Sequence, residues 1–245
     1  MLWILILTSS NAISQNTKFL SIPPVQIPGL SLWLRSDSAV ALNGTNVLQW
    51  NDCSGNGNNA IQNTTSYQPI LIENILNGYS AINFNGNQGL NISNVNLGTI
   101  GCSVFLVAKV NLKTSYGMFL TYGTSTTGSW NFRQVENTGR FSFVNGVSNI
   151  GAGATNATTP IGSTQNLEGA GFKILYGEVN SSSNNWQIYE NGNSKDSRNE
   201  AFDQSVNETI YIGHRNNALK LNGDIVEIII YDSTPTPSSK PTGNT

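Results

Sequence analysis

Charge is scarce in this chain of 245 residues. Lys, Arg, Asp and Glu together make up only 11% of it, and the formal net charge is −2. Proteins that bind nucleic acids neutralise phosphates with clustered Lys and Arg side chains, and no such cluster occurs in this sequence. We therefore expect no nucleic-acid partner.

Long hydrophobic runs are also missing. A membrane-spanning helix needs roughly 20 consecutive apolar residues, whereas the apolar run at the start, Leu2–Leu7, is far shorter. Small polar residues and Ala12-Ile13-Ser14 follow it, which favours a signal peptide over residues 1–15, with a buried first strand as the alternative. We expect no membrane span and a protein that is secreted or held at the cell surface.

Histidine and cysteine, the usual ligands of zinc, are rare, with one histidine and two cysteines in the whole sequence. Structural zinc sites need four such ligands close together. A hydrolase triad on a nucleophile elbow needs a Gly-x-Ser-x-Gly motif, which is absent. We therefore expect neither a zinc site nor a triad, and we expect His214 to be an ordinary surface residue.

The two cysteines, Cys53 and Cys102, form an even count in a chain that we expect to be exported. Disulfides persist in oxidising compartments. A bridge between them would close a loop of about 50 residues and contribute about 4 kcal/mol in the chain-entropy model. We expect this disulfide, and two unpaired, partly buried thiols are the alternative.

Helical periodicity is absent, and short β-type segments take its place. The strongest is Leu221–Asp232, whose near-continuous run of Ile, Val and Tyr predicts a central strand covered on both faces. Asn-Gly dipeptides between segments suit tight hairpin turns, and residues 146–165 are expected to form a long loop. The other predicted strands are Gly29–Arg35, Val47–Trp50, Ser80–Phe84, Cys102–Val110, Tyr116–Tyr122, Ser129–Gln134, Arg140–Asn145, Phe172–Val179, Asn185–Glu190 and Glu208–Arg215.

Many short antiparallel strands in one chain predict an all-β fold, a two-sheet antiparallel jelly-roll sandwich. Proline marks the limits of this domain at both ends. We predict a linker over residues 16–28, one jelly-roll domain over residues 29–233, and a Pro/Ser/Thr-rich linker or tail over residues 234–245 of a larger modular protein.

Six motifs follow one another in an order that resembles the laminin-G-like, concanavalin A-like lectin/glucanase family. They are Pro28–Leu34 (PGLSLWL), Trp50–Ala60 (WNDCSGNGNNA), Leu76–Gly86 (LNGYSAINFNG), Ile188–Gly192 (IYENG), Ile210–Gly213 (IYIG) and Gly223–Asp232 (GDIVEIIIYD). The resemblance implies a jelly roll whose first and last strands come together. It also implies an extracellular module that binds carbohydrate or another extracellular partner.

Catalytic carboxylates are not recognisable. Retaining glycosidases need two carboxyl groups about 5 Å apart, and the family's enzymes carry a Glu-x-Asp-x-x-Glu motif that this sequence lacks. Asp224 and Glu227 are three residues apart, so on a regular strand they would face opposite sides. We therefore expect no catalytic residues in this chain.

A loop with alternating oxygen-bearing side chains begins at Asp52. Asp52, Ser54, Asn56 and Asn58 imitate the start of a calcium-binding loop, but Asn63 stands where the closing acid would be. The candidate cofactor is therefore Ca²⁺ bound weakly. The alternative is a turn in which these side chains bond their own backbone.

Sugar-binding sites on this fold use exposed aromatic rings with amide or charged partners. Trp130, with Asn131 and Arg133 in a turn-rich segment, is the best candidate for such a site, and packing in the core is the alternative for the ring. We hypothesise a non-catalytic extracellular module that recognises carbohydrate or a surface partner. A spacer or adhesin domain without a ligand, and a glycan-active hydrolase with an atypical site, are the alternatives.

Overall fold

The structure is a computed structural model, and it describes residues 23–124, 128–135, 138–146, 161–202 and 204–234. Within them the chain forms 17 strands and two short 3-10 turns. In chain order these are η1 (Pro24–Gln26), β1 (Leu30–Arg35), β2 (Val40–Asn43), β3 (Asn46–Trp50), β4 (Ala60–Ile61), η2 (Thr65–Tyr67), β5 (Ile70–Leu76), β6 (Tyr79–Asn85), β7 (Leu90–Val95), β8 (Gly101–Val110), β9 (Met118–Tyr122), β10 (Trp130–Gln134), β11 (Arg140–Asn145), β12 (Ile161–Asn166), β13 (Lys173–Asn180), β14 (Asn185–Glu190), β15 (Asn193–Asn199), β16 (Glu208–Ile212) and β17 (Asn222–Tyr231).

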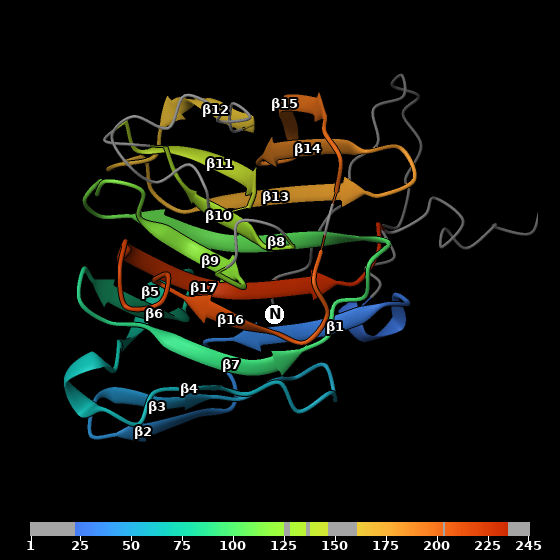
Figure 1. Cartoon of the computed structure of the whole chain (residues 1–245). Coiled ribbons are helices and arrows are strands. Elements are labelled where there is room, and N and C mark those ends of the chain that lie inside the picture. The colour runs from blue at the N-terminus through green and yellow to red at the C-terminus, as the bar shows by residue number, and fades with distance from the viewer. Residues whose placement is uncertain (1–22, 125–127, 136–137, 147–160, 203, 235–245) are drawn as a thin grey trace, which may run out of the picture.

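Two antiparallel layers build the fold (Figure 1). We call β15-β14-β13-β8-β17 the back sheet; it continues through β1 beside one half of β17 and through β6 and β5 beside the other half. We call β4-β7-β16-β9-β10-β11-β12 the front sheet. β3 pairs with both β4 and β5 and so joins the layers. The predicted all-β jelly-roll sandwich is confirmed.

β17 lies at the centre of the back sheet, as its sequence predicted. Its side chains alternate: Ile228 and Ile230 belong to the core between the sheets, whereas Ile229 and Tyr231 pack in a small cluster on the outer face. Both faces are therefore covered, which explains why the run is apolar throughout. β1 pairs along the same half of β17, with Leu32 opposite Ile230, so the first and last strands of the domain are neighbours.

A β-bulge corrects one expectation about β17. The register shifts between Ile225 and Glu227, so the alternation of side chains is interrupted there. Ile225 and Ile228 both face the core, and Asp224 and Glu227 therefore share the outer face of the back sheet. The prediction that these two carboxylates face opposite sides is wrong, because it assumed a regular strand.

Several strands are missing from the sequence prediction. β5, β7 and β15 were not predicted, and β15 (sequence NSKDSRN) carries no apolar side chain by which it could be recognised. The expected loop over residues 146–165 is wrong in its last part, because β12 begins at Ile161 and pairs with β11. Residues 147–160 lie outside the described part of the chain.

Part of the predicted linker packs against the domain. The η1 turn (Pro24–Gln26) precedes β1, Ile27 packs on the outer cluster of the back sheet, and the hydroxyl of Tyr231 donates to the carbonyl oxygen of Pro24 at 3.2 Å. The predicted signal peptide and residues 235–245 of the predicted tail lie outside the described residues, so the division of the chain at these points stays a prediction.

The predicted disulfide is absent, and both cysteines are free thiols. Cys102 on β8 points into the core with Val104, whereas Cys53 packs against the outer cluster that contains Phe105. Residues 102 and 105 lie three apart on one strand and so face opposite sides of the sheet. The back sheet therefore separates the two sulfur atoms.

Thiol labelling should show this arrangement. Cys53 is partly exposed and Cys102 is fully buried, so an alkylating reagent is expected to modify one thiol in the native protein and both in denaturant. Burial raises the pKa of both thiols, so the native reaction should be slow at neutral pH. A mass decrease of two hydrogens in the unreduced protein, with no thiol labelled in denaturant, would contradict the structure.

Candidate functional site

Trp130 does not form an exposed sugar-binding platform. Its side chain is 0% exposed in the core between the sheets, and its ring stacks on Tyr122 with 5.6 Å between centroids. The indole N–H donates to Oε1 of Gln204 at 2.9 Å. The candidate platform at Trp130 is therefore wrong and the alternative, packing in the core, is confirmed, because side chains on β10 alternate and both Trp130 and Phe132 face the core.

Asn131 and Arg133, the other two residues of this candidate, lie on the outer face of the front sheet. Both are buried, and the guanidinium of Arg133 lies over the ring of Tyr116, with its Cζ 4.8 Å from the ring centroid. Nδ2 of Asn131 donates to the carbonyl oxygen of Gly146 at 2.7 Å. The three residues proposed as one site therefore divide between two faces of the same strand.

A row of outward residues crosses the front sheet through Asn131. Strand pairing places one residue from each of five neighbouring strands in register. From β7 to β11 the row consists of Asn91, Tyr211, Thr121, Asn131 and Val144. We call these residues the polar row. Thr121, Asn131 and Val144 are buried, so only the end of the row at Asn91 and Tyr211 is partly exposed to solvent.

Two polar atoms in the middle of the polar row have no hydrogen-bond partner among the described residues. They are Oγ1 of Thr121 and Oδ1 of Asn131, and both side chains are 0% exposed. Buried polar groups in native proteins are almost always satisfied by protein, water or ligand. These two atoms lie opposite each other across β9 and β10 and are fully covered, so a ligand at the surface does not reach them in this structure.

A cleft of about 570 Å³ opens at the β7 end of the polar row. It is lined by residues 57–59, 61–64 and 91–93, which contribute mainly amide and hydroxyl side chains and no charged one. Ile61 pairs with Asn91 and adds an exposed apolar surface. The cleft thus combines polar groups with a small apolar patch, as binding sites for small ligands do.

Among the described residues, three amides of the cleft have a hydrogen-bond partner at one end only. Nδ2 of Asn58 donates to the carbonyl oxygen of Ser31 at 2.9 Å, and Oδ1 of Asn59 accepts from the backbone N–H of Asp52 at 2.9 Å. Oδ1 of Asn91 lies 2.8 Å from Nε2 of His214. The opposite end of each amide remains available for a ligand, so the orientation is fixed before binding.

Tyr211 places an aromatic ring beside this cleft. It is half-buried, it neighbours Asn91 in the polar row, and its ring meets the His214 ring edge-on with 5.3 Å between centroids. Sequence reasoning missed it as a binding residue. The alternation in β16 could have indicated it: Ile210 and Ile212 face the core, so Tyr211 between them points to the outer face.

His214 is buried, not a surface residue as expected, with 1% of its side chain exposed. Burial, together with the nearby positive charge of Lys220, lowers the pKa of its imidazole to about 4. The ring is therefore neutral near pH 7.

Four hydrogen bonds hold the carboxylate of Asp52 in the loop after β3. Oδ1 accepts from the backbone N–H groups of Trp33 and Ser54, and Oδ2 accepts from the Ser54 hydroxyl and the Asn58 N–H, all within 3.0 Å. Asn56 turns its nitrogen, not its oxygen, towards the carbonyl groups of β1. This network is the hydrogen-bonded turn named above as the alternative. Calcium at Asp52 stays a prediction, and it would require these donors to be displaced.

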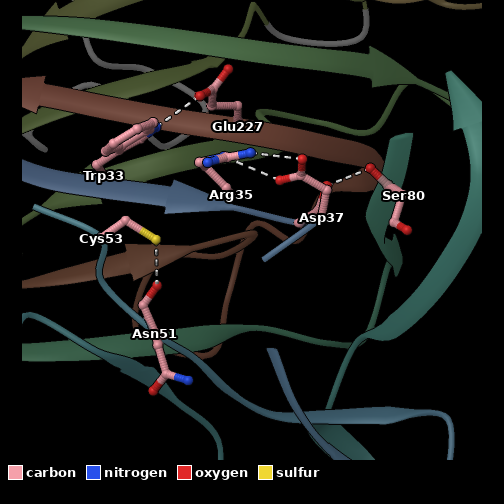
Figure 2. A network of polar contacts seen from close by, with 8 residues as sticks. Trp33, Arg35, Asp37, Asn51, Cys53, Ser80 and Glu227 are labelled. Carbon is pink, nitrogen blue, oxygen red and sulfur yellow. Dashed lines mark hydrogen bonds and ion pairs between the residues drawn. The ribbon is translucent and has the colours of Figure 1, made fainter. Parts of the chain in front are cut away.

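The outer face of the back sheet carries a second polar network (Figure 2). The Trp33 indole N–H donates to Oε1 of Glu227 at 2.8 Å, and Arg35 pairs with Asp37 through two contacts of 3.1 and 2.8 Å. Burial raises the pKa of the Glu227 carboxyl, while the Trp33 hydrogen bond and the Arg35 charge oppose this shift. The Trp33–Glu227 hydrogen bond ties β1 to β17.

Asp224, on the same outer face, is fully engaged. Its carboxylate pairs with Lys109 at 2.8 Å and accepts from the amides of Asn83 and Asn111. A cation and two amides already occupy the oxygen atoms of this carboxylate, which suits a structural role. Within the described residues, no group of three or more His, Cys, Asp or Glu side chains could hold a metal ion, and no helix has the length and apolarity to cross a membrane.

Comparisons of sequence find no matching family model and no matching curated protein. Comparisons of structure find β-sandwich domains. Domain 4 of AbnA, an extracellular arabinanase from Geobacillus stearothermophilus in complex with arabinotriose, matches with a TM-score of 0.61 and 16% identity over 85% of this chain and 95% of that one. The CBM40 of a Ruminococcus gnavus sialidase, bound to α2,3-sialyllactose, matches with a TM-score of 0.50 and 10% identity over 69% of this chain and 94% of that one. Trypanosoma rangeli sialidase matches with a TM-score of 0.52 and 14% identity over 84% of this chain and 30% of that one.

These similarities support the lectin-like jelly-roll fold. Identities of this size carry the architecture alone, and the resemblance to laminin G in particular stays a prediction.

Proposed function

We propose that this protein is a non-catalytic module that recognises carbohydrate on the outer face of the front sheet. The observation that carries the proposal is the cleft in which Asn58, Asn59 and Asn91 are each held at one end and open at the other. Sugar hydroxyls are donors and acceptors at once, so fixed amides that offer both kinds of group are suited to them. The fold of the similar structures supports this proposal, since two of them are solved with bound sugars.

The apolar side of a sugar ring also needs a partner. Tyr211 and Ile61 offer such surfaces on either side of Asn91 in the cross-strand register. A sugar ring in the cleft would thus meet the polar amide of Asn91 between two apolar surfaces, which is how sites that orient small ligands are built.

We further propose that the protein acts outside the cell, since amide-rich, charge-poor surfaces and the predicted signal peptide agree with export. The carboxylates Asp224 and Glu227 are engaged in structural contacts on the opposite face from the cleft. This separation supports recognition without catalysis.

Replacing Tyr211 with alanine tests the proposed face. We expect binding of the wild-type protein to at least one immobilised oligosaccharide of a glycan array, and about a tenfold loss of affinity in Tyr211→Ala, which corresponds to about 1.4 kcal/mol. The matched control is Tyr189→Ala, a half-buried tyrosine on the back sheet, which should bind as the wild type does.

The same array should be read with calcium and with chelator. Binding that survives chelation would remove calcium from the proposal, and binding lost on chelation would make Asp52 the next residue to change. Silence of folded wild-type protein across the array would overturn carbohydrate recognition and favour a spacer or protein-binding domain.

A further inference from the structure

His214 lies directly behind the cleft without lining it. It follows the end of β16 and packs against Gly89, where an added Cβ atom would stand only 2.0 Å from Cδ2 of the imidazole. Position 89 therefore needs glycine to admit the ring. The imidazole occupies a fixed place between the start of β7 and the turn after β16, and any rotation of the ring is blocked by this close packing.

Its two nitrogen atoms have different partners, and these settle the tautomer. The backbone N–H of Asn217 donates to Nδ1 at 2.9 Å, so Nδ1 is an acceptor and carries no proton. A neutral imidazole then carries its proton on Nε2. Lys220 is a cation near the ring, and its charge favours the neutral form of the imidazole.

The protonated Nε2 fixes the amide of Asn91. Nε2 lies 2.8 Å from Oδ1 of Asn91, and with the proton on Nε2 this oxygen must be the acceptor. Asn91 therefore cannot exchange the positions of its oxygen and nitrogen without losing the bond. Its Nδ2 group, with two N–H donors, is left for the cleft that Asn91 lines.

We propose that His214 is a positioning residue that sets Asn91 as a hydrogen-bond donor in the cleft, and that the cleft takes an acceptor oxygen of an uncharged oligosaccharide. This inference rests on the proposed function and names its ligand class. The absence of charged side chains among the described residues that line the cleft matches an uncharged sugar, because no group there would neutralise a carboxylate.

Two substitutions of His214 separate the roles of its nitrogens. His214→Gln places an amide nitrogen near the position of Nε2 and keeps a donor for Asn91. His214→Asn places an oxygen near Nδ1 and keeps the acceptor for Asn217, but it removes the donor. If the ring only fills space, both variants should lose binding in proportion to their loss of stability.

The measurement is the affinity for arabinotriose, with α2,3-sialyllactose as the charged comparison, by isothermal titration calorimetry on the full chain. We expect His214→Asn to bind arabinotriose about tenfold more weakly and His214→Gln to stay within about threefold of the wild type, at temperatures where both are folded. Equal losses, or no loss in His214→Asn, would overturn the positioning role. Wild-type binding of sialyllactose alone would overturn the uncharged ligand class.

Nuclear magnetic resonance tests the positioning without any ligand. The imidazole nitrogen shifts of His214 should report the Nε2–H tautomer at pH 7, and the tautomer protonated on Nδ1 would overturn the inference. If the wild type binds neither sugar, the proposed function and the ligand class fail together. The tautomer and the solvent exchange of the Asn91 side-chain N–H groups then still decide whether His214 presents Asn91 as a donor.

Discussion

Replacing Trp130 with alanine is expected to lower the free energy of unfolding by about 4 kcal/mol, because a fully buried indole leaves a large cavity. The ring contacts Tyr122 in a stacked arrangement and Phe143 edge-on, each with 5.6 Å between centroids. Its removal also leaves Oε1 of Gln204 without the indole donor. Urea denaturation followed by far-ultraviolet circular dichroism measures the effect.

Trp130→Phe is the matched control, since it keeps an aromatic ring in the core and removes the N–H. It should lose clearly less stability than the alanine variant. A loss below about 1 kcal/mol in Trp130→Ala, combined with a loss of oligosaccharide binding, would contradict the buried position and restore the hypothesis of a sugar-binding platform.

Stability should fall as the pH is lowered from about 6.5 to about 4, and His214 is responsible. Its pKa is about 4 in the folded protein against 6.5 ordinarily. The unfolded chain therefore binds more protons within this window, and up to about 3 kcal/mol of unfolding free energy is lost as the pH falls. The contribution is fully present above pH 6.5 and absent below the folded-state pKa.

Glu227 acts in the opposite sense in an overlapping window. Because burial raises its pKa, the folded state favours its protonated form, and the associated stability is present at low pH and lost as the pH rises. Both the wild type and His214→Gln contain Glu227, so its contribution cancels when their unfolding free energies are compared at each pH. We expect the difference between their unfolding free energies to shrink by about 3 kcal/mol between pH 6.5 and pH 4. A difference independent of pH would contradict the buried neutral imidazole.

Alternation of apolar and polar side chains was sufficient to predict most of the sandwich. The near-continuous apolar run in Leu221–Asp232 indicated a central strand covered on both faces, and β17 is that strand. The prediction failed for β15, because this strand contains no apolar side chain. It lies at the edge of the sheet, where its side chains need not be buried. The prediction also failed at the bulge before Glu227, because one inserted residue reverses the face of everything before it.

The candidate site depended on information that local sequence does not contain. Asn91 and Asn131 are forty residues apart, and only the pairing of four strands brings them into one row. The turn around Asp52 was named correctly as one of two alternatives, yet only the positions of its hydrogen-bond donors identify it. Cys53 and Cys102 were expected to pair because their number is even, and number says nothing about which side of a sheet each one faces.

The pairing of β1 with β17 determines how the domain would respond to tension. The two strands are antiparallel, and Leu30 at the start of one lies opposite Tyr231 at the end of the other. A force that pulls these two ends apart acts across the ladder and opens its hydrogen bonds one after another, like a zipper, instead of loading them together in shear. A tether anchored through both ends would therefore yield early along this seam.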